Sequence, residues 1–133
     1  MIINDIGEQE PFQAFAAISE NVLNKKVTGL VDGQRIYELP KSIKGEWDFT
    51  LLTRKASQIG GFARLFFEVD INPNGKYDIV IRSVNSSDAR TASVTNLSFK
   101  LITDIKNKLF ELPETKTVFY DVTPKPPATI EYV

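Results

Sequence analysis

The 133 residues carry 16 Lys and Arg against 17 Asp and Glu, a formal net charge of −1, and contain neither Cys nor His. The missing Cys excludes disulfides and thiolate metal sites, and the missing His excludes imidazole bases and triads within this chain. The basic residues are not concentrated in any one stretch. This disfavours nucleic-acid binding, because a nucleic-acid surface needs a basic footprint that displaces phosphate counterions.

Length and composition are typical of one globular domain. Apolar residues make up 42% and charged residues 25% of the chain, close to the averages for folded proteins. A chain of this length buries enough surface to fold without a metal or a disulfide. No window approaches the roughly 18 apolar residues of a membrane span, and the start lacks the pattern of a signal peptide. We therefore expect one cytoplasmic domain over residues 1–133, with residues 123–133 as an extended C-terminal arm.

The first half of the chain predicts a helix followed by strands. Pro11 suits the first position of a helix, and the spacing of the following apolar residues extends that helix to about Leu23. Val27–Val31 and Gln34–Leu39 flank an Asp-Gly pair, which is typical of a β-hairpin turn. The alternation of apolar and polar residues over Glu46–Arg54 predicts another strand.

The second half predicts two strands, a helix and a last strand. Phe62–Ile71 and Tyr77–Val84 have strand patterns, and a polar stretch longer than most loops follows them. A helical stripe then covers Asn96–Leu112, and Thr117–Val122 has the pattern of a strand. Hairpin-length connections favour an α+β fold, an antiparallel sheet of about five to six strands with two helices packed on one face.

The segment around Asn72–Gly75 is the most informative in the chain. Its Asn-Pro-Asn-Gly sequence suits a type I turn followed by a left-handed Gly, which closes a bulged hairpin. This register pairs only apolar residues on the core face, namely Ile71 with Tyr77, Val69 with Ile79, and Phe67 with Ile81. It also sets Asp70 directly opposite Asp78. Like charges opposite each other destabilise a sheet, so we expect them to be compensated. The candidates are Lys76, Arg82 or Arg64, a bound cation, or a basic partner.

A metal site is a weaker interpretation of the same segment. Residues 70–75 reproduce the first half of a calcium loop, but Ile81 stands where the bidentate Glu is required and the flanks are strands. We therefore expect no metal and no cofactor. Two interpretations of the acidic hairpin remain, a solvated tip or a surface that docks a basic protein. For the docking surface the candidate residues are Glu68, Asp70, Asp78 and Asp88.

The favoured functional hypothesis is a non-catalytic binding module. A compact α+β body with an acidic edge and without catalytic His or Cys resembles small inhibitors of the immunity-protein and antitoxin type. Such an inhibitor would block another, basic protein through its acidic surface, and neither nucleic acid nor membrane is expected as a partner. The alternative is an assembly subunit of a phage or secretion-type structure, which would form homo-oligomers through the arm Thr123–Val133. An enzyme using carboxylates, Lys or Tyr is the third hypothesis.

Overall fold

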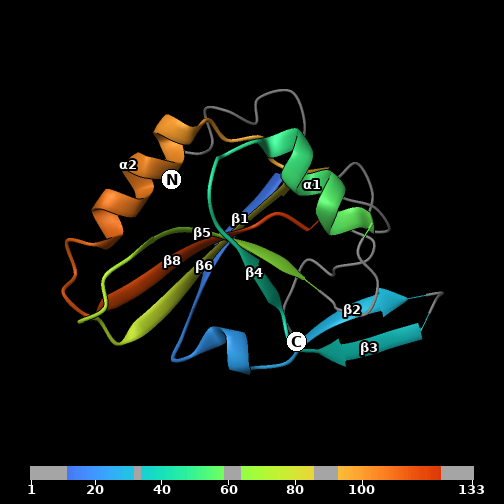
Figure 1. Ribbon diagram of the computed structural model, residues 1–133, viewed down its shortest axis with the longest axis horizontal. Coiled ribbons are helices and arrows are strands. Elements are labelled where there is room, and N and C mark those ends of the chain that lie inside the picture. The colour runs from blue at the N-terminus through green and yellow to red at the C-terminus, as the bar shows by residue number, and fades with distance from the viewer. Residues whose placement is uncertain (1–11, 32–33, 59–63, 86–92, 124–133) are drawn as a thin grey trace.

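The computed structural model describes residues 12–31, 34–58, 64–85 and 93–123. Two helices and a set of short strands make up this part of the chain, which confirms the α+β class (Figure 1). In chain order they are β1 (Phe12–Ser19), the 3-10 turn η2 (Val22–Asn24), β2 (Val27–Val31), β3 (Gln34–Glu38), β4 (Lys41–Ile43), α1 (Phe49–Gln58), β5 (Leu65–Ile71), β6 (Tyr77–Asn85), β7 (Ser93–Val94), α2 (Phe99–Leu109) and β8 (Thr115–Asp121). No helix of the described residues is long and apolar enough to span a membrane.

One large sheet contains six of the described strands. Its order is β1-β6-β8-β5-β4, with the short β7 on β6. The β6–β8 and β4–β5 pairs are parallel and the remaining pairs are antiparallel. The prediction of a purely antiparallel sheet is therefore wrong. The reason is that β8, which follows α2 in the chain, inserts between β5 and β6 instead of adding to an edge.

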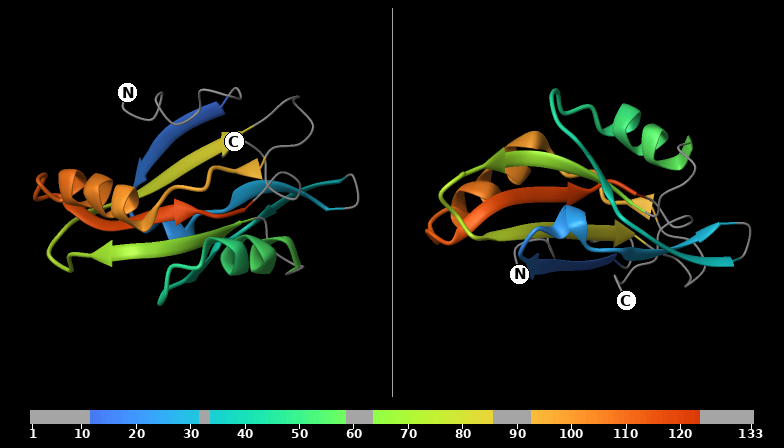
Figure 2. Two further views of the ribbon diagram at one scale, coloured as in Figure 1. Left: turned by 90° about the horizontal axis from the view of Figure 1, so that it is seen from above. Right: turned by 60° about the horizontal axis from the view of Figure 1, so that its bottom comes forward.

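The hairpin predicted near residue 30 is confirmed as a separate two-stranded sheet. β2 and β3 pair antiparallel from Val27 with Glu38 to Val31 with Gln34, and their predicted Asp-Gly turn lies outside the described residues. Figure 1 and Figure 2 show this hairpin extending beyond the large sheet. Each strand of the hairpin therefore has its ladder partner within the hairpin itself.

Two segments have the secondary structure opposite to the predicted one. Phe12–Ser19 is strand β1 and not a helix, because it pairs residue by residue with β6 along its whole length. Phe49–Gln58 is helix α1 and not a strand. The Asp48 carboxylate accepts a hydrogen bond from the Leu51 N–H at 3.1 Å, which is the contact of a helix N-cap. The pairing of β1 with β6 joins residues far apart in the chain, so no local sequence pattern reveals it. Around Asp48, the alternation of apolar and polar residues resembles a strand, although Asp48 is a helix N-cap.

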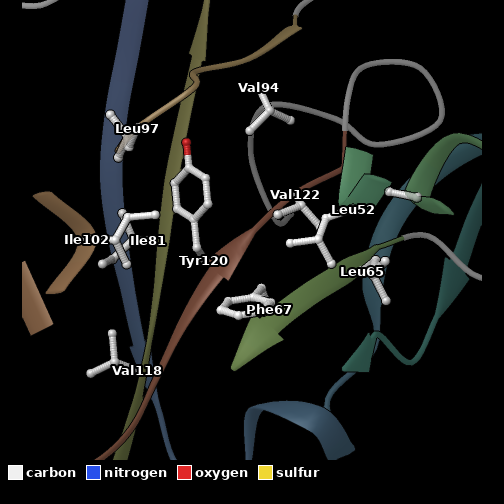
Figure 3. Close-up of a cluster of buried hydrophobic side chains, with 11 residues drawn as sticks. Leu52, Leu65, Phe67, Ile81, Val94, Leu97, Ile102, Val118, Tyr120 and Val122 are labelled. Carbon is white, nitrogen blue, oxygen red and sulfur yellow. The ribbon is translucent and has the colours of Figure 1, made fainter. Parts of the chain in front are cut away.

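The main hydrophobic core joins both helices to the central strands (Figure 3). Leu52 and Ala56 of α1 and Ile102 of α2 contact buried residues of the sheet. The other members of this cluster are Leu65, Phe67, Ile81, Val94, Leu97, Val118, Tyr120 and Val122. Side chains alternate along a strand, so Phe66, Val80 and Phe119 point to the opposite face, where they form a second cluster with Val22.

The helix predicted after the polar stretch is confirmed, with a later start. α2 begins at Phe99, and the Ser98 hydroxyl accepts a hydrogen bond from the Leu101 N–H at 3.1 Å as its N-cap. Residues 93 and 94 of the predicted loop form β7 on β6 instead, and residues 86–92 lie outside the described residues. The predicted arm likewise lies outside them from residue 124 onward.

Candidate functional site: a buried arginine–aspartate cluster

The predicted hairpin between β5 and β6 is open, and this arrangement builds the site. The turn itself forms, with the Gly75 N–H donating to the Asn72 carbonyl at 3.0 Å. The start of β8 then enters between the two strands, and the Asn72 and Lys76 N–H groups donate to the carbonyls of Lys116 and Glu114. The predicted pairing of β5 with β6 is therefore wrong, and so is the direct opposition of Asp70 and Asp78.

Gly75 is required for a different reason from the predicted one. It is not among the residues with a positive φ, so a left-handed conformation does not explain it. A Cβ at this position would lie 2.3 Å from the carbonyl oxygen of Thr115. The turn thus packs directly on the backbone of β8, and only a residue without a side chain fits there.

The three predicted docking residues that the structure describes have different surroundings. Asp70 binds Lys106 of α2, with 3.3 Å between Oδ2 and Nζ, and is exposed. Asp78 is buried, and its Oδ2 accepts a hydrogen bond from the Val22 N–H at 2.9 Å. Glu68 is partly buried opposite Phe119. Asp88 lies outside the described residues. A register shift between Glu68 and Asp70 turns Asp70 toward α2.

The charged residues that the fold does gather are Arg64, Arg82 and Asp121. Arg64 Nη1 lies 3.0 Å from Asp121 Oδ2, and Arg82 Nη1 lies 3.2 Å from Asp121 Oδ1. All three side chains are completely buried. The strand order explains the arrangement, because β8 carries Asp121 between the start of β5 and the end of β6. Asp121 therefore has an arginine on each side.

This environment keeps the Asp121 carboxylate ionised. Burial acts to raise its pKa, but the Arg82 and Arg64 guanidinium groups, with the Thr123 N–H, lower it below its ordinary value of 3.8. Removing charges from water costs several kcal/mol for each ion, so the close geometry and the added hydrogen bonds must offset that cost. Substitution of any of the three residues should therefore lower the stability of the fold strongly.

The cluster also fixes the backbone where β8 ends. The Thr123 N–H donates to Asp121 Oδ1 at 2.9 Å, and Arg82 Nη1 donates to the Thr123 carbonyl. The Thr123 hydroxyl accepts from the Leu65 N–H at 2.7 Å and donates to the Leu65 carbonyl at 3.3 Å. Each polar atom of Thr123 is therefore bound, and the chain leaves the cluster directly into residues 124–133.

A second polar group lies on the face that carries the main core. The Tyr120 hydroxyl donates to the Thr95 carbonyl at 2.7 Å, and the Ser83 hydroxyl donates to Thr95 Oγ1 at 2.8 Å. Thr95 Oγ1 in turn donates to Asn85 Oδ1 at 2.5 Å. Burial raises the pKa of Tyr120, so this phenol stays neutral. Together with the pairing of Asn85 with Ser93 in β6 and β7, these contacts hold the backbone on both sides of residues 86–92.

Neither the arginine–aspartate cluster nor the hydrogen bonds around Thr95 were predicted from the sequence, although the sequence contains a signal for the first. Arg82 and Asp121 each stand alone inside an apolar strand, within the runs Ile79–Val84 and Val118–Val122. Charged residues are almost never fully buried unless they are paired. Two lone opposite charges in buried strands therefore indicate an ion pair. The participation of Arg64 has no comparable signal, since it stands near the start of its predicted strand, where a charge is unremarkable.

The comparisons with known proteins converge on one family. The model of the family described as "GMP synthase C terminal domain" matches residues 72–132, a little under half of the chain. This segment spans β6, β7, α2 and β8, and it includes Arg82, Asp121 and Thr123. Arg64 lies outside it. The chain is thus similar to that domain over the part that forms the two central strands.

Curated relatives give the same result over the same share of the chain. A subunit of the glutamine-hydrolyzing GMP synthase of Sulfurisphaera tokodaii is 44% identical over 63 residues, which are 47% of this chain and 17% of the relative. The protein of the same description from Saccharolobus islandicus strain M.14.25 is 42% identical over 65 residues, 48% of this chain and 18% of the relative. The protein of the same description from Thermoplasma acidophilum is 44% identical over 57 residues, which are 42% of this chain and 18% of the relative. The chain therefore matches less than a fifth of the length of these relatives.

These similarities contradict the first two functional hypotheses drawn from the sequence, the protein inhibitor and the assembly subunit. The relatives are described as subunits of a GMP synthase, which is an enzyme, and not as immunity proteins, antitoxins or phage or secretion-machine subunits. The expectation of a non-enzyme, and that of a basic protein partner or an arm-mediated homo-oligomer, are corrected with them. The error has a physical origin. Missing His and Cys exclude only the chemistry of those side chains, and a domain that contributes to an enzyme through binding needs neither.

Proposed function

We propose that this chain acts in the formation of GMP, as the C-terminal-domain part of an enzyme of the GMP synthase type. One observation carries the proposal, the match of residues 72–132 to the model of that family. Relatives with the same description are 42–44% identical over 57 to 65 residues of this chain. The matched part is the structural centre of the molecule, because β6 and β8 lie inside the sheet. The chain covers less than a fifth of those relatives, so the glutamine hydrolysis named in their descriptions is not part of this proposal.

The buried cluster supports a role in holding a nucleotide. Arg82, Asp121 and Thr123 of the matched segment form one hydrogen-bonded network where the backbone continues into residues 124–133. The Tyr120 and Thr95 contacts hold the ends of residues 86–92 in the same way. Residues 86–92 and 124–132 both fall within the family match. When the backbone at the ends of a ligand-binding segment is held in place, less conformational entropy is lost as the ligand binds, so the site is preorganised.

The domain organisation belongs to the same proposal. We take residues 1–133 as one domain with both helices on one face of the sheet, because Leu52, Ala56 and Ile102 contribute to one hydrophobic cluster. That cluster combines residues inside and outside the matched segment, so the unmatched half is needed for the core. A cytoplasmic location, expected from the sequence, is kept as part of the proposal.

A segment exchange tests the function. Residues 72–132 of this chain would replace the matching segment of the GMP synthase subunit from Sulfurisphaera tokodaii, and GMP formation by the reconstituted enzyme would be followed by chromatography. The parent protein and the parent without the segment are the controls. We expect the exchanged protein to form GMP well above the deletion. A folded exchanged protein, shown by a cooperative thermal transition, that forms no more GMP than the deletion would contradict the proposal.

Binding by the chain itself gives a second measurement. Calorimetric titration of the full chain with GMP should show saturable binding, and the same titration with AMP should be weaker because the purine substituents differ. Equal heats for GMP and AMP, or none for either, would count against a nucleotide-holding role.

A further inference from the structure

Arg64 lies in the half of the chain that the family model does not match, yet its contact is with the matched half. Its Nη1 binds Asp121 Oδ2 at 3.0 Å, and both side chains are fully buried. The neighbouring residue Leu65 is also engaged, through its N–H and carbonyl, with the hydroxyl of Thr123. The start of β5 is thus joined to the end of β8 by side-chain contacts in addition to the sheet ladder.

The two carboxylate oxygens of Asp121 have different tasks. Oδ1 faces Arg82 and accepts from the Thr123 N–H, whereas Oδ2 faces Arg64. The last torsion of an Asp side chain is broad and nearly two-fold, so each contact on a carboxylate oxygen narrows the orientations that the group can adopt. Arg64 fixes the second oxygen. The guanidinium on Oδ2 therefore preserves the orientation in which Oδ1 reaches the Thr123 amide.

We infer that Arg64 is a positioning residue, which acts through Asp121 to fix the backbone of Thr123, directly before residues 124–133. This inference rests on the proposed function, because residues 124–132 belong to the segment shared with the GMP synthase family. Arg64 is completely buried and binds Asp121, which in turn accepts the hydrogen bond of the Thr123 N–H. The unmatched half of the chain thereby contributes directly to the geometry of the matched half, beyond completing its core.

A purely structural ion pair would behave differently from a positioning residue. Loss of a structural contact lowers the stability of the whole domain, and every protected amide then exchanges faster by a similar factor. Loss of a positioning contact acts first at Thr123. The two interpretations are therefore separated by comparing an Arg64 variant with a variant that destabilises the core elsewhere.

The matched pair of variants is Arg64→Met and Leu52→Ala. Leu52 lies in α1 and is almost fully buried in the main core, and it belongs to none of the contacts around Asp121. Hydrogen exchange of the Thr123 amide would be measured by NMR in the full-length chain, relative to that of a β6 amide such as Val80. We expect the ratio to rise at least about tenfold in Arg64→Met and to stay unchanged in Leu52→Ala, because tenfold corresponds to loss of about one hydrogen bond's stabilisation. An unchanged ratio in Arg64→Met would overturn the inference.

Arg64→Lys keeps the experiment decisive if Arg64→Met does not fold. Lysine retains the charge but lacks the planar, rigid fork of the guanidinium, so it should hold Oδ2 less firmly. We expect an intermediate rise in the Thr123 ratio. A ratio equal to that of the unmodified chain would also overturn the inference, because charge alone would then suffice.

Titration with GMP tests whether Arg64 affects nucleotide binding. It also distinguishes failure of the Arg64 inference from failure of the proposed function. If the unmodified chain binds GMP, Arg64→Met should weaken binding by about tenfold or more, and Leu52→Ala should not, in conditions where each variant is fully folded. Equal affinity of the unmodified chain and Arg64→Met would overturn the link between Arg64 and the nucleotide. Absence of binding by the unmodified chain would count instead against the proposed function, while the Thr123 exchange ratio would still decide the role of Arg64.

Discussion

Two carboxylates of the large sheet, Asp70 and Asp121, each bind basic side chains, but under opposite conditions. Asp70 pairs with Lys106 at 3.3 Å at the surface, where 49% of the Asp70 side chain is exposed. Asp121 binds two arginines with none of its side chain exposed. Water and salt can replace the partner of Asp70 at little cost. For Asp121 no such replacement exists, so the same type of contact has a far larger effect on the fold.

The comparison teaches that the position of a charge matters more than its presence in a pattern. Of the acidic residues that stand out in the sequence, Asp70 forms an exposed ion pair and Asp78 accepts a buried hydrogen bond from a backbone N–H. The residues that organise the site are single charges within apolar strands, which become important only when β8 brings them together. Four predictions, from the largest effect to the smallest, test this difference.

The largest effect is expected for Asp121→Asn. The change leaves two buried guanidinium groups facing a neutral amide, and removal of one partner from a buried ion pair costs about 3–5 kcal/mol. Urea unfolding at pH 7 measures the loss. Asp104→Asn is the matched control, since Asp104 forms an exposed pair with Lys100 on α2. A loss for Asp121→Asn no larger than that of the control would remove the distinction between buried and exposed carboxylates.

Protonation of Asp121 at low pH should also remove its contribution to folding stability. The pKa of Asp121 in the folded protein lies below its ordinary value of 3.8. The ionised carboxylate therefore makes its full contribution to folding stability at pH values above 3.8. The contribution is lost as the pH falls below that value, through the folded pKa. The stability difference between the unmodified chain and Asp121→Asn should therefore be constant from pH 7 to about 5 and shrink below about 4. Urea unfolding at a series of pH values checks this, and a difference independent of pH down to about 3 would contradict it.

A smaller loss is expected on the opposite face for Tyr120→Phe. The change keeps the ring in the core but removes the hydrogen bond to the Thr95 carbonyl, which should cost about 1–2 kcal/mol. Burial raises the pKa of Tyr120 above its ordinary value of 10.0, so the unfolded chain ionises first and stability falls above about pH 10. Thermal unfolding at pH 7 and about pH 10.5 measures both effects. The phenylalanine variant should lose less stability on going to the higher pH, and an equal loss in both proteins would rule out this role for Tyr120.

The smallest effect is expected for Asp70→Asn. An exposed ion pair contributes about 0.2–1 kcal/mol, and salt screens it further. The variant should therefore differ little from the unmodified chain in urea unfolding, and the difference should shrink in about 1 M NaCl. A loss comparable to that of Asp121→Asn would show that the two carboxylates are not distinguished by burial.

Several elements are predictable from the sequence because their signals are local. The hairpin of β2 and β3, the strands β5, β6 and β8, and helix α2 follow from alternation, turn residues and helical spacing within short windows. Phe67, Val69 and Ile81 do face the main core, as expected.

The two wrong elements show where local patterns mislead. The aromatic residues Phe12 and Phe15 fit a helical stripe, yet β1 is a strand because its ladder partner β6 lies far along the chain. Trp47, Phe49 and Leu51 alternate as in a strand, yet α1 begins at Phe49 behind the Asp48 cap. In both cases a short periodic pattern is outweighed by a remote partner or by a cap.

What the sequence by itself determined is the α+β class, the turn at Asn72–Gly75 and the set of apolar residues available for a core. Tertiary structure alone decided that β8 lies between β5 and β6. It thereby decided that Asp121 meets Arg64 and Arg82, and that Asp70 and Asp78 are kept apart. The physical reason is that strand order depends on contacts between residues far apart in the chain, such as Arg64 and Asp121, which are separated by 57 positions. No local propensity encodes such a contact, because its stabilisation exists only once the sheet has closed around it.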